Sequence, residues 1–123
     1  MDIYRELILD HYKHPKNFGS LKNKTSSAQA LNATCGDRIV MDVHVDSKKK
    51  LVDVKFSGVG CAISQASASM LTEKVKGLST EKILSITAED IIAMLGTTLT
   101  PSRIKCATLP LEVLHAALLS KSV

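Results

Sequence analysis

The sequence has no tryptophan and only two tyrosines and two phenylalanines among its 123 residues. Proteins that hold single-stranded nucleic acids stack the bases on aromatic side chains, so this scarcity argues against that function. The net charge of +4 is also far from the basic excess of a dedicated nucleic-acid-binding protein. We therefore expect no nucleic-acid partner.

Long apolar runs and targeting segments are missing as well. No uninterrupted apolar stretch approaches the roughly 20 residues that span a bilayer. Asp2 and Glu6 interrupt the N-terminal segment, which lacks the basic and apolar regions of a signal peptide. The chain is 45% hydrophobic and 23% charged, which is typical of a folded globular domain. We expect a single domain over residues 1–123, a cytoplasmic location and no membrane partner.

Two stretches alternate between apolar and polar residues, as half-buried strands do. Residues 37–46 and 51–57 show this period, and the polar turn at 47–50 joins them into a predicted antiparallel hairpin. Residues 15–34 are polar and rich in turn-forming residues, which predicts a mobile loop. The residues expected to face the core are Ile39, Met41, Val43 and Val45 in the first stretch and Val52, Val54 and Phe56 in the second.

Helical periodicity marks the other elements, and the expected fold class is α+β, a small sheet packed with helices. Small alanine and serine side chains dominate the helix that begins at Cys61, so that helix can lie close against a neighbouring backbone. The predicted helices are residues 2–14, residues 61–76, two short helices after Ser79 and Thr87, and a last helix with Pro110 in its first turn.

Candidate chemistry centres on three cysteines, Cys35, Cys61 and Cys106. An odd number of cysteines in a reducing compartment argues for thiols that bind metal or react, and against a disulfide framework. Each cysteine lies at a predicted element boundary, and we place Cys61 and Cys106 at helix N-termini. The helix dipole there favours thiolates, and Arg103 and Lys105 add positive charge beside Cys106.

Asp37 is the fourth candidate ligand, two residues after Cys35, and the intervening Gly36 allows both side chains to face one point. Three thiolates and a carboxylate suit tetrahedral zinc, and thiolates equally suit an iron–sulfur cluster. Such a site would carry net negative charge, which Arg103 and Lys105 would partly offset. The alternative interpretation is that the cysteines are small buried apolar residues and that Asp37 is an ordinary turn residue.

Three segments that contain these residues resemble motifs of the U-type iron–sulfur cluster assembly proteins, the family of SufU, IscU and the NifU N-terminal domain. The resemblance covers nearly the whole chain. It is strongest to SufU, because Lys105 stands where IscU proteins carry histidine, although the interval between the second and third cysteines has IscU-like length. The segments are Ala33-Thr34-Cys35-Gly36-Asp37, Gly58-Val59-Gly60-Cys61-Ala62-Ile63-Ser64 and Arg103-Ile104-Lys105-Cys106-Ala107-Thr108-Leu109.

The resemblance implies an α+β fold of the SufE/NifU type, with about three antiparallel strands packed on one face by helices; periodicity does not place the third strand. It also implies that sulfur arrives as a persulfide from a pyridoxal-phosphate-dependent cysteine desulfurase. The sulfur is then built into a transient [2Fe–2S] or [4Fe–4S] cluster or passed to a downstream scaffold or apo-acceptor protein. The implied ligands of Zn²⁺ or of the cluster are Cys35, Asp37, Cys61 and Cys106.

We predict that Cys35 accepts the persulfide sulfur, because it lies in a glycine-containing loop next to the polar segment 15–34. Cys106 is the rival acceptor. Three functions stay open: a cluster scaffold, a zinc-dependent sulfurtransferase that relays sulfur, and a zinc-structured binding module without catalysis. Metal content and stimulation of a desulfurase distinguish them.

Overall fold

Three antiparallel strands form a single sheet in the order β1-β2-β3, and five helices accompany it in the described part of the chain. The computed structural model describes residues 3–32 and 36–120. The α+β class expected from the sequence is confirmed. The elements are α1 (Ile3–Lys13), β1 (Ser26–Asn32), β2 (Asp37–Val45), β3 (Leu51–Val59), α2 (Ala62–Val75), α3 (Thr80–Leu84), α4 (Ala88–Leu95) and α5 (Pro101–Leu119).

Strands β2 and β3 form the predicted hairpin, with one error in the predicted inward set. The core-facing residues of β2 are as predicted, although Asp42 on its other face is also buried. Val54 and Phe56 of β3 are fully buried. Val52, however, is 51% exposed, and Leu51 is buried in its place. The pairing register shifts between His44 and Val45, so Val52 is an extra, bulged residue of β3 without a partner in β2. A bulge bends the strand, and before this one the core-facing positions change from even to odd residue numbers, so that Leu51 faces the core.

Strand β1 lies inside the segment 15–34 that the sequence predicted to be a loop. That prediction was wrong for residues 26–32, whereas residues 15–25 form no helix or strand. The strand pairs with β2 along its whole length, at the edge of the sheet. Its inward side chains, Ala28 and Ala30, are small because α5 packs directly against β1, whereas Leu31 on the other face is 70% exposed. A strand of small and polar residues gives almost no hydrophobic signal.

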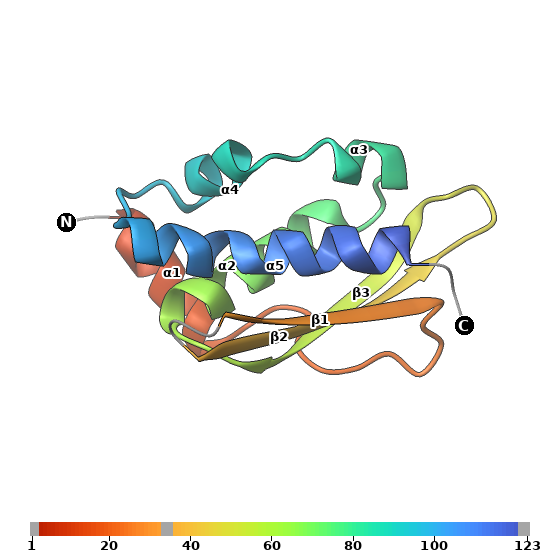
Figure 1. Cartoon of the computed structure of the whole chain (residues 1–123), viewed down its shortest axis with the longest axis horizontal. Coiled ribbons are helices and arrows are strands. Elements are labelled where there is room, and N and C mark those ends of the chain that lie inside the picture. The colour runs from red at the N-terminus through yellow and green to blue at the C-terminus, as the bar shows by residue number, and fades with distance from the viewer. Residues whose placement is uncertain (1–2, 33–35, 121–123) are drawn as a thin grey trace.

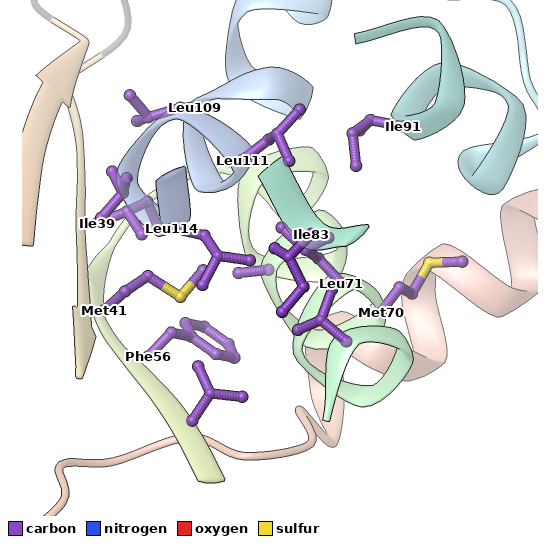
Figure 2. Packing of buried hydrophobic residues seen from close by; sticks show 14 of the residues in the cluster. Ile39, Met41, Phe56, Met70, Leu71, Ile83, Ile91, Leu109, Leu111 and Leu114 are labelled. Carbon is purple, nitrogen blue, oxygen red and sulfur yellow. The ribbon is translucent and has the colours of Figure 1, made fainter. Parts of the chain in front are cut away.

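The helices gather over one face of the sheet (Figure 1). α5 packs against β1 and β2, and α2 packs against β3, while α1 packs on α2. The core fills the space between these layers, where Met41 and Phe56 of the sheet face Leu71 of α2 and Leu114 of α5 (Figure 2). None of the described helices is both long and apolar enough to cross a membrane.

The last helix begins nine residues before Pro110, at Pro101, which corrects the sequence prediction. Thr100 is the N-cap and Pro101 is the first helical residue, where a proline loses no hydrogen bond. Pro110 therefore lies inside α5, and Cys106 lies in its second turn. Because Cys106 is not at the N-terminus of a helix, the dipole argument made for its thiol does not apply.

Helix α2 has the close packing that its small residues predicted. Ten of its fourteen residues are buried, the serines among them. The hydroxyl of Ser69 lies 2.7 Å from Nδ1 of His11 and accepts a hydrogen bond from the backbone N–H of Lys16, also at 2.7 Å. These contacts attach the end of α1 to α2.

Candidate metal centre

Three of the four predicted ligands converge on one point. Ligand atoms of Asp37, Cys61 and Cys106 all lie within 4.8 Å of one another. They come from the start of β2, the N-cap of α2 and the second turn of α5. Cys35, the fourth predicted ligand, lies outside the described residues.

The sheet register brings Asp37 to Cys61. Arg38 pairs with Val59, so Asp37 at the start of β2 lies beside the end of β3, one step from α2. The backbone N–H of Cys61 donates to Oδ1 of Asp37 at 3.0 Å, and Sγ of Cys61 lies 3.7 Å from Oδ2. Asp37 is only 1% exposed, so its carboxylate belongs to a buried polar cluster.

Two glycines permit this close approach. A Cβ on Gly58, which has φ +120°, would lie 2.0 Å from the backbone oxygen of Arg38. A Cβ on Gly60 would lie 2.3 Å from Oγ of Ser64 and 3.2 Å from Oδ1 of Asp37. At Gly58 a side chain would clash with the backbone of β2, and at Gly60 it would displace the side chains of Ser64 and Asp37, so both glycines favour this arrangement.

Helix α5 supplies the third candidate ligand, Cys106. Cys106 is 1% exposed, whereas Cys61 is partly exposed, so the two described cysteines differ in their access to solvent. Arg103 and Lys105 are exposed residues of the same helix. Their electrostatic support of the site stays a prediction.

The donor set fits a tetrahedral zinc ion. With Zn–S near 2.3 Å and Zn–O near 2.0 Å, neighbouring ligand atoms lie about 3.5 to 3.8 Å apart. The Asp37–Cys61 separation of 3.7 Å already has this value. The widest separation of up to 4.8 Å exceeds it by about 1 Å, within reach of side-chain rotation. Two sulfurs and one carboxylate leave one tetrahedral position for a further ligand.

Ser64 also lies beside these residues, although its sequence context predicted only a small side chain that permits close packing. Its hydroxyl donates to the backbone oxygen of Cys61 at 3.1 Å, and its Oγ lies 3.9 Å from Sγ of that residue. The side chain is fully buried. The available signal was its place three residues after Cys61, since a side chain there reaches back to the N-cap residue.

The chain is similar to known proteins over nearly its whole length. The model of the NifU-like N terminal domain family matches residues 3–121. The chain is 43% identical to the zinc-dependent sulfurtransferase SufU of Bacillus subtilis, over 92% of this chain and 87% of that protein. It is 39% identical to the iron–sulfur cluster assembly scaffold protein IscU of Aquifex aeolicus, over 94% of this chain and 73% of that protein.

Solved structures share the fold. A crystal structure from Fervidobacterium islandicum, of a proposed iron–sulfur cluster assembly scaffold protein for the SUF system, has a TM-score of 0.81 and 32% identity. The match covers 92% of this chain and 94% of that one. The N-terminal part of a NifU-like protein from Brucella abortus has a TM-score of 0.73 at 16% identity, covering 94% and 92% of the two chains, which is a likeness of fold.

Proposed function

We propose that this chain, which belongs to the NifU-like N-terminal domain family, acts in iron–sulfur cluster assembly as a zinc-dependent acceptor and carrier of persulfide sulfur. The observation that carries the proposal is the convergence of Asp37, Cys61 and Cys106 within 4.8 Å. The SufU relative, named as a zinc-dependent sulfurtransferase, supports the same function. The proposal treats residues 1–123 as one domain.

The proposed zinc ligands are Cys35, Asp37, Cys61 and Cys106. When bound, Zn²⁺ would keep the cysteines as thiolates at neutral pH and orient them. The carboxylate of Asp37 is the hardest of these ligands and the least well matched to a thiolate-rich site. Arg103 and Lys105 would offset part of the negative charge of the ligands.

The proposed transfer is a thiolate–persulfide exchange. A thiolate of this chain attacks the outer sulfur of a persulfide on the cysteine desulfurase. A new S–S bond forms on this chain, the S–S bond on the desulfurase breaks, and the desulfurase cysteine leaves as a thiolate. The sulfane sulfur moves without a change in the total number of electrons, so no further oxidant or reductant is required.

The burial of Cys106 bears on which cysteine accepts the persulfide sulfur. Cys106 is 1% exposed inside a helix that packs on the sheet, so it is enclosed and a protein partner could reach its sulfur only after a structural change. This burial disfavours Cys106. Cys61 is partly exposed but is anchored at the start of α2, where its backbone N–H is bonded to Asp37, so Cys35 stays the proposed acceptor. The proposed partners are a pyridoxal-phosphate-dependent cysteine desulfurase and a downstream scaffold or apo-acceptor protein, in the cytoplasm.

A scaffold for a transient [2Fe–2S] or [4Fe–4S] cluster is the second candidate. The thiolates of the site can ligate iron, and the similarity to a protein named as an IscU scaffold favours this function. A zinc-structured binding module without catalysis is the third interpretation. These functions differ in the metal bound and in whether sulfur is transferred.

The deciding experiment combines metal analysis with a transfer assay. Purified chain is analysed for zinc and iron, mixed with a purified SufS-type desulfurase and cysteine, and examined for persulfide by alkylation and mass spectrometry. We expect one zinc per chain, persulfide on the wild type, no persulfide on Cys35→Ser, and continued transfer to Cys106→Ser. Full transfer to Cys35→Ser would show that another cysteine accepts the sulfur. Zinc binding without any persulfide would favour the binding module without catalysis.

A further inference from the structure

Two buried serines on α2 fix the backbone beside both described cysteine ligands. Ser64 and Ser67 are one helical turn apart, and both are fully buried. The hydroxyl of Ser64 donates to the backbone oxygen of Cys61 at 3.1 Å. The hydroxyl of Ser67 donates to the backbone oxygen of Ala107, the residue after Cys106, at 2.6 Å. One helix therefore contacts the main chain next to each sulfur.

At Cys61 the main chain is held on both sides. Its N–H donates to Oδ1 of Asp37 at 3.0 Å, and its carbonyl accepts from Ser64 Oγ and from the N–H of Gln65, both at 3.1 Å. With these groups fixed, the direction of Sγ depends mainly on one side-chain torsion. The space for the Ser64 hydroxyl exists because residue 60 is glycine.

At Cys106, Ser67 is bonded to α5 next to a position where a proline interrupts the backbone hydrogen bonds of that helix. Pro110 lies four residues after Cys106 and has no N–H to donate, and a proline ring also displaces the carbonyl four residues before it. The helix thus loses one of its own backbone hydrogen bonds at the turn that carries the sulfur. The bond from Ser67 to Ala107 ties that turn to α2.

We propose that Ser64 and Ser67 are positioning residues that hold the sulfurs of Cys61 and Cys106 at the spacing required by one metal ion. Both hold the main chain beside a ligand cysteine, and Ser64 also contacts Sγ of Cys61 at 3.9 Å; neither serine is proposed as a metal ligand. This inference rests on the proposed metal site. Groups that orient metal ligands typically contribute about 10- to 100-fold to metal affinity.

The same helix offers a matched control. Ser69 is also fully buried, and its hydroxyl contacts His11 and the N–H of Lys16 rather than the ligand cysteines. Ser69→Ala therefore removes an equally buried hydroxyl from α2 while leaving the cysteine backbones untouched. It separates a general loss of stability from a specific loss of ligand geometry.

The experiment measures zinc affinity by competition with a chromophoric chelator, and ligand geometry by the visible spectrum of the Co²⁺-substituted chain. We expect Ser64→Ala and Ser67→Ala each to weaken zinc binding about tenfold or more and to change the Co²⁺ spectrum. Ser69→Ala should keep both at wild-type values. Circular dichroism checks folding, and if one variant of the pair does not fold, the other decides.

The Pro110→Ala variant tests the role of Ser67 at α5. Pro110→Ala restores an N–H that can donate to the carbonyl of Cys106, so Ser67→Ala should weaken zinc binding less in that background than in the wild type. An equal loss in both backgrounds contradicts the role given to Ser67. Wild-type affinity and spectrum in both serine variants overturn the inference, whereas absence of zinc binding by the wild type overturns the proposed function itself.

Discussion

The carboxylate of Asp37 accepts a 3.0 Å hydrogen bond from the backbone N–H of Cys61, 24 residues away in the chain. One oxygen thus satisfies a main-chain donor at the start of α2, while the other lies 3.7 Å from the sulfur of the same cysteine. The carboxylate has both a structural contact and a position suited to ligation. These two functions can be separated by substitution.

Asp37→Asn tests this separation. Asparagine keeps an oxygen that can accept from the N–H of Cys61 but removes the negative charge that attracts a cation. We expect zinc affinity to fall about tenfold or more, while the unfolding midpoint of the metal-free chain changes little. Chelator competition and thermal melts measure the two quantities. Unchanged zinc affinity would show that Asp37 is not a ligand.

Gly60→Ala should damage the site through steric crowding. The added methyl would meet Ser64 Oγ at 2.3 Å and Asp37 Oδ1 at 3.2 Å, so we expect a loss of about 1–3 kcal/mol in the free energy of unfolding and weaker zinc binding. The control is Gly77→Ala, where φ is +89° and no atom lies within 4 Å. That variant should lose stability through backbone strain and keep zinc affinity.

The turn between β2 and β3 predicts a pH dependence. The backbone N–H of Lys50, followed by that of Lys48, lowers the pKa of Asp46 below its ordinary value of 3.8. A lowered pKa means that Asp46 stabilises the fold above pH 3.8 and loses this contribution as the pH falls through its folded pKa. Asp46→Ala should therefore melt below the wild type at pH 7. The difference in melting temperature between the two proteins should narrow below pH 3.8 when the metal-free chains are melted. A difference that stays constant with pH would contradict this role of Asp46.

Thr87→Ala offers a stability change remote from the site. Thr87 and Asp90 form a reciprocal capping box at the start of α4, with each side chain bonded to the other's backbone N–H. Removal of the threonine oxygen should lower the free energy of unfolding by about 1 kcal/mol. Chemical denaturation measures this loss, and zinc affinity should stay at the wild-type value. Weaker zinc binding in this variant would mean that stability alone controls the site.

Much of the fold could be predicted from local patterns, and the failures have physical causes. The period of two in β2 and the capping box at Thr87 are signals within a few residues of sequence. Strand β1 was not predicted, because its core-facing residues, Ala28 and Ala30, are small and give little hydrophobic signal. Their size allows α5 to pack against the strand, and this contact between distant segments is not visible in the local sequence. The start of α5 was missed because Pro101 and Pro110 are both compatible with a helix N-terminus.

The sequence predicted three side chains that the structure brings together, but not the residues that anchor them. Cysteine and aspartate are common metal ligands, so their side chains could be predicted as candidates, and Asp37, Cys61 and Cys106 do lie close together. The anchoring groups gave no comparable signal, because Ser64 is chemically ordinary and acts only where the chain folds back. His11 likewise gave no local signal of its burial, which is 7% exposure, because its partner Ser69 lies 58 residues away in the chain.

The most direct test of the account is a Co²⁺ titration of the metal-free chain, followed by the thiolate-to-cobalt charge-transfer absorption in the near ultraviolet. The proposed site predicts saturation at one ion per chain, and a band that loses one thiolate's share in each of Cys35→Ser, Cys61→Ser and Cys106→Ser. A band that keeps its full intensity in Cys61→Ser or Cys106→Ser would show that the two sulfurs do not share one metal ion.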